Sequence, residues 1–336
     1  MKKLIPIFLV LLTLALCACS STTYSESFYA MNTYMSITAN CPGSRNVVKE
    51  AKNTITKLDK TLSAFNKNSD IYKLNEKGSA DISTETAGLL QDAVNYSKLT
   101  NGAFNPALLK VTKLWGFPDR KYRIPSDKEL KEALKTAKPD EIEINGYKVS
   151  LNQEGMEIDL GAIAKGYASQ KITDSFKSKG VKSALINLGG NVQTIGTKED
   201  GNPWLVAIKY PKPDKQYLGQ LKVKDKAVVS SGQYERNFKK NGKTYGHIIN
   251  PENGYPAQKG LLSTTVIYKD AVFADAMSTA LYVMGEEDAL KFWANSKENF
   301  DIVFYNEKGE LLVSEGAAGN FSSDIKYKVV KKSDYE

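Results

Sequence analysis

Histidine and cysteine are the two residue types that this chain of 336 residues almost lacks. It has one histidine, His247, and three cysteines, and none of them forms a pair at a spacing typical of a zinc site. The G-x-G-x-x-G motif of dinucleotide-binding folds is absent, and Asn237 stands where a Walker A motif ending at Gly242-Lys243-Thr244 needs its first glycine. There is no arginine-rich run either, so nucleic-acid binding is not indicated.

Residues 1–18 have the features of a lipoprotein signal peptide. Two lysines precede an apolar run over residues 4–16, which is too short to span a membrane. The motif Leu-Cys-Ala-Cys that ends at Cys19 resembles a bacterial lipobox, so we expect cleavage before Cys19 and lipidation of its thiol. Ordinary secretion with cleavage nearby is the alternative. Residues 19–27 would form a tether, and the protein would be exported and lipid-anchored to the outer face of the bacterial cytoplasmic membrane.

Residues 28–336 are expected to fold as one unit. They contain no low-complexity block, Pro/Ser linker or internal repeat. After processing, Cys41 would be the one free thiol left, so the unit would depend on its hydrophobic core and not on a disulfide. The formal charge of +8 is modest and spread along the chain. A basic surface of this kind suits an anionic membrane or a phosphate-rich ligand.

Helix and strand patterns alternate irregularly along this unit. Apolar spacing, a capping box and terminal glycines predict helices starting at Ser44, over Thr84–Leu99, starting at Ser126, from Gly161 to Gly180, and over Phe273–Met284 and Glu286–Ala294. Strands are predicted over Glu141–Asn145, Tyr147–Leu151, Met156–Asp159, Ser183–Leu188, Trp204–Lys209, Leu261–Tyr268, Asp301–Tyr305 and Leu311–Ser314. Hairpins mixed with helices predict an α+β fold with largely antiparallel sheets packed by helices, and they argue against a doubly wound fold.

The lone histidine lies in a segment rich in hydroxyls, glycines and prolines, Val228–Pro256. Imidazole titrates near neutral pH, so His247 is the one obvious candidate for a general base. A single histidine often does no more than satisfy a turn. The polar and loop-forming residues on either side of His247 in the sequence favour a functional role for it.

Two further segments have groups suited to a phosphate-containing ligand. Asp275 and Thr279 are four apart in a predicted helix, so both oxygens face one side and suit Mg²⁺, although a solvated helix face is the alternative. In the second segment Gly161 precedes a helix start, where free N–H groups and Lys165 suit a pyrophosphate. Asp159 would be repelled by phosphate, so it suits neutral donors of the ligand. A glycine turn with a helix N-cap is the alternative there.

Six segments resemble, in order and spacing, the ApbE family of FAD:protein FMN transferases. They are Met31–Thr33, Asn101–Pro106, Ile158–Tyr167, Ala184–Asn191, the stretch around His247, and Ala274–Ala280. The resemblance covers nearly the whole chain after the tether and implies a single globular ApbE-like unit, related to the T-fold. It also implies Mg²⁺-dependent transfer of FMN from FAD to a Thr or Ser hydroxyl of an exported acceptor protein, through a phosphoester bond and with release of AMP.

The resemblance implies roles for individual residues. The metal ligands would be Asp275, Thr279 and the main-chain carbonyl of Ala162. The positions that contact FAD would be Met31, Phe65, Ala103, Phe104, Asn105, Asp159, Lys165 and Ile249. Asn105 and Gln170 stand where the family often has Asp; we expect the loss of a carboxylate there to alter metal affinity or flavin orientation but not to be essential to the mechanism.

Two other functions remain open from the sequence. One is an FAD pyrophosphatase that gives FMN and AMP, with water in place of the acceptor hydroxyl. The other is a non-catalytic, lipid-anchored flavin-binding protein, which would need a pocket but neither base nor metal. Sequence cannot separate transferase from hydrolase, because the nucleophile is not part of this chain.

Overall fold

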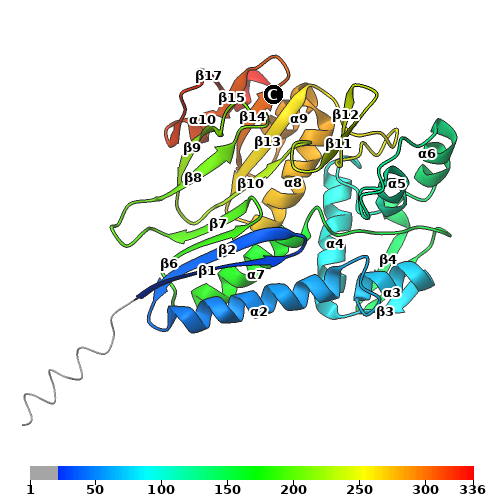
Figure 1. Ribbon diagram of the computed structural model, residues 1–336, viewed down its shortest axis with the longest axis horizontal. Coiled ribbons are helices and arrows are strands. Elements are labelled where there is room, and N and C mark those ends of the chain that lie inside the picture. The colour runs from blue at the N-terminus through cyan, green and yellow to red at the C-terminus, as the bar shows by residue number, and fades with distance from the viewer. Residues whose placement is uncertain (1–21) are drawn as a thin grey trace, which may run out of the picture.

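A nine-stranded sheet forms the centre of the fold in the computed structural model, which describes residues 22–336 (Figure 1). The strand order is β1-β2-β6-β7-β10-β13-β14-β15-β17, and every neighbouring pair is antiparallel except β15 and β17. In that order the strands are Thr22–Ala30, Thr33–Cys41, Ser183–Leu188, Asn191–Gly196, Ala227–Ser231, Leu261–Tyr268, Asp301–Asn306, Leu311–Ser314 and Tyr327–Val330.

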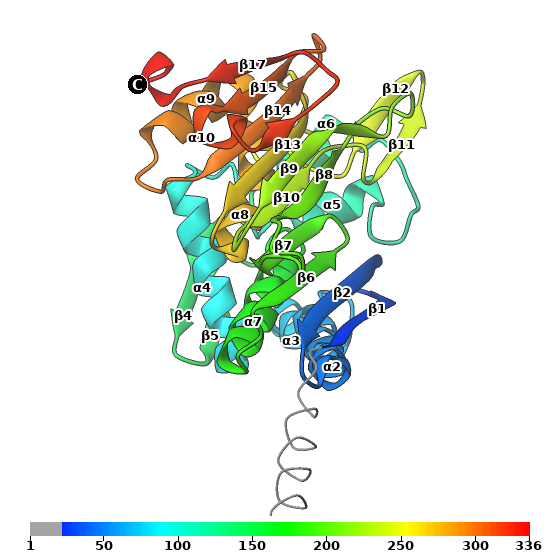
Figure 2. The same cartoon turned by 90° about the vertical axis from the view of Figure 1, so that its left-hand side faces the viewer.

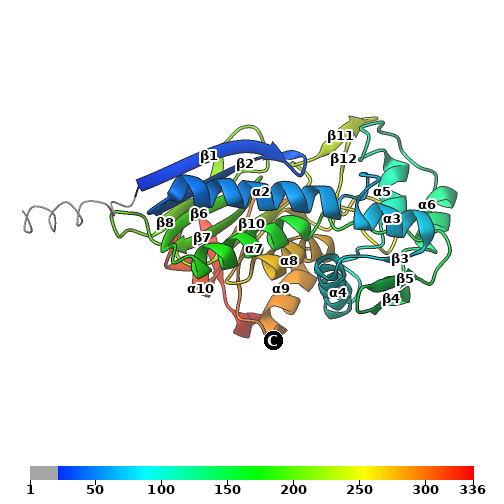
Figure 3. The ribbon, with the colours of Figure 1, turned by 90° about the horizontal axis from the view of Figure 1, so that it is seen from below.

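Four helices cover one face of this sheet, as the view from below shows (Figure 3). They are α2 (Ser44–Leu62), α7 (Ala164–Ser178), α8 (Ala271–Met284) and α9 (Glu286–Asn295). Strand β2 shows why the sheet presents an apolar face to them: Met35, Ile37 and Ala39 alternate with more exposed residues and are all buried. Strands β7, β13 and β14 are buried on both faces, because the opposite side of the sheet is covered too.

A three-stranded sheet covers that opposite side. Its order is β16-β9-β8, with β8 at Trp204–Lys209, β9 at Tyr217–Val223 and β16 at Phe321–Ser322. Val206 and Ile208 of β8 share an apolar cluster with Val192 and Val228 of the large sheet. Figure 2 shows β8 and β9 in front of the large sheet. The fold therefore has three layers: helices, large sheet and small sheet.

A helical lobe extends from one end of these layers, on the right in Figure 1. It contains α3 (Asp70–Lys77), α4 (Thr84–Leu99), α5 (Leu109–Trp115), α6 (Asp127–Leu134), η1 (Pro139–Glu141) and the strands β3 (Ser79–Asp81), β4 (Ile142–Asn145) and β5 (Lys148–Leu151). The hairpin of β11 (Asn237–Lys240) and β12 (Lys243–Gly246) packs on this lobe through an aromatic cluster that includes Trp115, Phe117 and Phe238. Two short elements, α10 (Glu315–Ala318) and η2 (Lys332–Asp334), lie near the end of the chain.

The predicted fold class is confirmed, and so are most of the predicted elements. Helix α4 and the strands β6, β8 and β13 have the predicted bounds. Ser126 and Glu129 form the predicted capping box of α6, and β4 and β5 form the predicted hairpin. Its two loop residues are Gly146 and Tyr147, because Asn145 pairs with Lys148 as the last residue of β4. Helix α8 begins earlier than predicted because the carboxylate of Asp270 accepts the N–H groups of Val272 and Phe273.

Two expectations about local structure were wrong. Met156–Asp159 is not a strand, because Ile158 and Asp159 bond to the side chain of Asn75 and the carbonyl of Pro106 instead of a neighbouring strand. Thr22–Ser27, expected as part of a tether, form most of β1 and pair in register with β2 from Cys41 to Ser36. The folded unit therefore begins at least as early as Thr22.

The predicted signal peptide, residues 1–18, and the predicted lipidation site, Cys19, lie outside the described residues. Between residues 22 and 336, none of the helices has both the length and the apolar character needed to span a membrane.

Candidate active site

One cavity of about 390 Å³ brings together all the predicted FAD, metal and catalytic residues. Its lining includes Met31, Phe65, Ala103, Phe104, Asn105, Asp159, Ala162, Lys165, His247, Ile249, Asp275 and Thr279. Segments far apart in sequence supply these walls: the β1–β2 turn, the end of α2, the loops after α4 and before α7, the chain after β12, and α8. The volume lies in the range of about 300–1,000 Å³ that is usual for sites of small molecules and cofactors.

His247 is held so that one ring nitrogen is available as a base. Its Nδ1 lies 3.3 Å from the main-chain oxygen of Arg236. A carbonyl oxygen only accepts hydrogen bonds, so in the neutral ring Nδ1 has the hydrogen and Nε2 has a free lone pair. Burial in the cavity wall, with the positive charges of Arg236 and Lys165, lowers the pKa of His247 to about 4. The imidazole is therefore neutral at pH 7 and able to take a proton.

Asp275 is a buried carboxylate at the bottom of the same cavity, with 3% of its surface exposed. Its Oδ2 accepts a hydrogen bond of 2.7 Å from the N–H of Gly166 near the start of α7. Burial raises the pKa of Asp275, while Lys165 and the Gly166 bond act in the opposite direction. A cation bound here would favour the ionised carboxylate.

Two hydroxyl residues, Ser231 and Thr279, line the same cavity as that carboxylate. The Oγ of Ser231 lies 2.8 Å from the Oγ of Ser278 and 3.4 Å from the Oγ1 of Thr279. With the carbonyl group of Ala162, these are hard oxygen donors of the kind that Mg²⁺ prefers, so the residues present fit that metal. Among residues 22–336 no three His, Cys, Asp or Glu side chains gather as a metal site, so such an ion would need these hydroxyl and main-chain oxygens beside Asp275.

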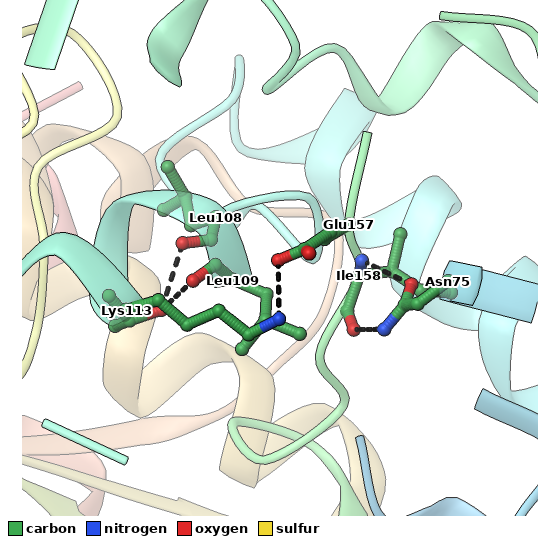
Figure 4. A network of polar contacts seen from close by, with 7 residues as sticks. Asn75, Leu108, Leu109, Lys113, Glu157 and Ile158 are labelled. Atoms are coloured by element: carbon green, nitrogen blue, oxygen red, sulfur yellow. Dashed lines mark hydrogen bonds and ion pairs between the residues drawn. The ribbon is translucent and has the colours of Figure 1, made fainter. Parts of the chain in front are cut away.

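A hydrogen-bonded brace holds the segment that ends at Asp159 (Figure 4). The side chain of Asn75 donates to the Ile158 carbonyl at 2.9 Å and accepts from the Ile158 N–H at 2.8 Å. The N–H of Asp159 donates to the carbonyl of Pro106 at 2.8 Å. Burial raises the pKa of Asp159, and the N–H of Gly161, 3.1 Å from Oδ1, partly offsets this. The brace fixes the carboxylate against the cavity without any strand pairing.

The helix after Gly161 offers fewer free donors than expected. The N–H of Ala164 donates to Leu160, and the N–H of Gly166 is taken by Asp275. Lys165 lines the cavity between them. The side-chain charge of Lys165 is thus the clearer feature for an anion.

The cavity mouth has an exposed aromatic ring and an unusual turn. Phe65 is 53% exposed, so its ring is available to stack on a planar ligand. Met31 and Asn32 have φ angles of 44° and 60°, in the left-handed region that residues other than glycine rarely adopt. Asp59 of α2 accepts the N–H of Met31 at 3.1 Å and so stabilises this turn. The two residues form the loop of the β1–β2 hairpin, and positive φ angles at both positions are usual for a two-residue type I′ turn.

Phe104 and the two departures from the family pattern have clear structural roles. Phe104 is 2% exposed and packs edge-on against Tyr96, so it belongs to the core as well as the cavity wall. Asn105 donates to the carbonyl of Ala137 and accepts from the N–H of Ala107, and an ionised Asp could not make the first bond. Gln170 does not line the cavity; its oxygen accepts the N–H of Ala271 at the start of α8.

Sequence reasoning missed three polar residues of the cavity wall: Asp59, Ser231 as a neighbour of Thr279, and Glu235. Asp59 adjoins Leu58 on the amphipathic helix α2, and the pattern gives no sign that it meets Met31. For Ser231 and Glu235, the one signal in the sequence was that both lie in the segment Val228–Pro256 around His247.

A neutral imidazole, a buried carboxylate, two hydroxyls, a lysine and an exposed ring line one cavity and define a class of site. Such a site binds an anionic ligand with a planar ring system and can take a proton from a hydroxyl group. A model of the ApbE family matches residues 31–304. The chain therefore belongs to the ApbE family, and the predicted resemblance is confirmed.

Individual relatives agree with this assignment. A protein of Klebsiella pneumoniae named FAD:protein FMN transferase is 35% identical over 72% of this chain and 76% of its own length. One of Haemophilus influenzae with the same name is 29% identical over 94% of this chain and 97% of its own length. The crystal structure of the ApbE protein from Thermotoga maritima is 31% identical, with a TM-score of 0.81 over 88% of this chain and 98% of that one. The flavin transferase ApbE from Vibrio cholerae is 25% identical, with a TM-score of 0.79 over 89% of this chain and 99% of that one.

Proposed function

We propose that this protein transfers FMN from FAD to a Thr or Ser hydroxyl of another exported protein and releases AMP. The acceptor oxygen attacks the phosphorus on the flavin side of the diphosphate, a phosphoester bond forms, and the bond to the AMP phosphate breaks. One observation supports this most: the neutral His247, Lys165, Asp275 and the exposed Phe65 line the same cavity. The names of the family's relatives point to the same activity.

The residues of the chain supply positioning and proton transfer. Phe65 and Met31 would hold the flavin ring, and Lys165 would lie against the diphosphate. His247 would accept the proton of the acceptor hydroxyl at Nε2, while its Nδ1–H stays bonded to Arg236. General-base catalysis of this kind contributes about 10²–10⁴ in rate. In-line positioning of the hydroxyl contributes the rest, because phosphoryl transfer needs orientation more than covalent help.

Asp275, Thr279 and the carbonyl of Ala162 would hold Mg²⁺ in the same cavity. A bound Mg²⁺ supplies charge neutralisation for the diphosphate and for the leaving AMP. Gly166 orients the carboxylate of Asp275 for this purpose through its N–H.

The location of the protein is part of the proposal. The lysines, apolar run and Leu-Cys-Ala-Cys motif at the start of the chain support export and lipidation of Cys19. The protein would then stand on the outer face of the bacterial cytoplasmic membrane. Its acceptor would be exported too, and a covalently bound flavin cannot be lost outside the cell.

The direct test mixes purified protein, FAD, Mg²⁺ and total exported proteins, followed by a denaturing gel and mass spectrometry. We expect a fluorescent acceptor band with FMN on a Thr or Ser, and AMP in equal amount. His247→Ala should bind FAD but lose at least about 100-fold in transfer rate. His247→Asn is the matched control, because its amide nitrogen takes the place of Nδ1 and can still donate to the Arg236 carbonyl, but it does not act as a base.

Other results would contradict the proposal. An unmodified acceptor beside accumulating FMN and AMP would identify an FAD pyrophosphatase. Flavin binding that is unaffected by chelation, with no AMP produced, would identify a binding protein. Normal turnover by His247→Ala would remove His247 as the base.

A further inference from the structure

A second cavity, of about 450 Å³, adjoins the first, and the function proposed above gives it no role. The residues that line both cavities are Met31, Asn32, Lys165, Ser230, Glu235 and Arg236. Because the two cavities share these residues, they lie side by side, with the same side chains on the wall of each. His247 and Asp275 line only the first cavity.

The second cavity follows the free edge of strand β8. Val206 and Ala207 both line it, although neighbouring residues of a strand point to opposite faces. Contact with both faces places the cavity along the edge of the strand. Among the described residues β8 pairs with β9 and with no other strand, so its outer edge has main-chain N–H and C=O groups to offer. Edges of this kind bind extended peptides by adding them as a further strand.

The β6–β7 turn on another wall also presents main chain. Gly189 and Gly190 have φ angles of 66° and 94°, which glycine adopts without strain. A Cβ on Gly189 would lie 2.3 Å from the side chain of Thr33, so glycine is required for the close packing of this turn. A Cβ on Gly190 would have its nearest neighbour, Glu235, 4.0 Å away. This wall leaves room for a polypeptide main chain beside the turn.

The charged residues that line the second cavity indicate which charge its ligand has. Lys209 of β8 lines the second cavity and not the first, and its side chain is exposed. On the shared wall Lys165 and Arg236 face one carboxylate, that of Glu235. Cations outnumber carboxylates, which complements a segment with a negative charge close to its hydroxyl residue.

We propose that the second cavity is the subsite for the acceptor protein. An extended segment of the acceptor pairs with the edge of β8, and its Thr or Ser passes the shared wall to reach His247 and the flavin-side phosphorus in the first cavity. This inference rests on the transferase function proposed above. It adds where the protein substrate binds and which part of the enzyme selects it.

The test uses two variants that touch only the second cavity. Ala207→Trp fills it beside β8, and Lys209→Glu reverses the charge at its rim. Leu205→Trp and Lys222→Glu are matched controls, because both residues are exposed on the small sheet and neither lines either of these two cavities. The probe is the acceptor that the wild-type enzyme flavinylates among the exported proteins, purified, together with a synthetic peptide that spans its modified hydroxyl. We expect at least a tenfold rise in KM for acceptor and peptide in both test variants, with unchanged Kd for FAD and unchanged controls.

Three results would overturn the inference, and they are distinguishable. A weaker Kd for FAD with an unchanged KM for the acceptor would mean that the second cavity holds part of FAD. Wild-type constants in both test variants would mean that the acceptor binds elsewhere. Failure of the wild-type enzyme to flavinylate any protein would instead remove the proposed function, and this inference with it.

Discussion

At the scale of single residues, the environment of His247 decides what its imidazole can do. A histidine in water has a pKa of about 6.5, so much of it is protonated at slightly acidic pH. In this cavity, burial and the nearby charges of Arg236 and Lys165 bring the pKa to about 4. Nδ1 is committed to the Arg236 carbonyl, so the protonation that matters is that of Nε2. The cavity thus makes the imidazole a weaker base, but it keeps His247 in its neutral, reactive form near pH 7.

This pKa predicts an unusual pH profile. The reactive, neutral form of His247 is present above its folded pKa and is lost as the pH falls through about 4. The acidic limb of kcat/KM should therefore lie near 4 and not near 6.5, because kcat/KM reports the free enzyme. The measurement is the rate of FMN transfer between pH 3.5 and 8 at saturating Mg²⁺, with FAD varied. A limb at about 6.5 would show that the cavity does not perturb this histidine.

The sequence predicted the residues with chemical roles in the site better than the residues that hold the main chain of the site in place. His247, Asp275 and Lys165 could be identified because the chemistry needs an imidazole, a carboxylate and a cation, and few residues offered them in suitable patterns. Asp59 and Asn75 could not be identified in this way. Each acts on the main chain of a residue distant in sequence, Met31 and Ile158, and no local pattern encodes such a contact.

At the scale of elements, the site depends on how closely α7 approaches α8. Gly166 lies on the buried side of α7, and a Cβ there would be 2.3 Å from the Ala271 carbonyl and 2.6 Å from the Cβ of Asp275. The helices can approach this closely only because Gly166 has no side chain. The same approach brings the N–H of Gly166 to Asp275, so packing and the orientation of the carboxylate have one cause.

Gly166→Ala should therefore destabilise the fold, although alanine favours helices by about 1 kcal/mol over glycine. Overpacking of a tight contact costs about 1–3 kcal/mol, so a net loss in free energy of unfolding is expected. Urea denaturation measures this loss. Gly88→Ala in α4 is the control, because a Cβ at that exposed helical position has no neighbour within 4 Å and should be neutral or stabilising. Equal stability of both variants would contradict the packing argument.

Elements with strong local signals were predicted, and those defined by tertiary partners were not. Helix α4 and the β4–β5 hairpin have caps and turn residues that specify them locally. The segment Met156–Asp159 has the apolar pattern of a strand, but the fold places Asn75 and Pro106 beside it instead of another strand. Strand β17 pairs in parallel with β15, and the connection between them includes α10. A prediction based on consecutive antiparallel hairpins does not include such a pair.

At the scale of the whole molecule, the start of the chain belongs to the sheet. Strand β1 is an edge strand that pairs with β2 over all of its length. Glu26 of β1 forms an ion pair with Lys52 of α2, and Tyr24 and Phe28 pack against the main core. Removing part of β1 would expose an edge of β2 that is now paired.

Two truncated chains test this. A chain that begins at Thr22 keeps β1, whereas a chain that begins at Phe28 loses the first six of its nine residue pairs with β2. We expect the shorter chain to have a lower Tm and to self-associate, and the longer one to match a chain that begins at residue 20. Thermal unfolding and size-exclusion chromatography measure both properties. Equal Tm values and monomeric behaviour of both chains would restore the view of residues 22–27 as a tether.

If Cys19 is lipidated as proposed, the position of β1 limits how far the catalytic centre can lie from the membrane. Only Ser20 and Ser21 separate Cys19 from β1, and β1 leads directly to the turn of Met31 and Asn32 that lines both cavities. At about 3.3 Å per residue, the nine residues of β1 span about 30 Å. With a lipid on Cys19, as proposed, few residues would separate the membrane anchor from the folded enzyme. Its catalytic centre then works within a shallow zone above the bilayer, and an acceptor must present its hydroxyl inside that zone.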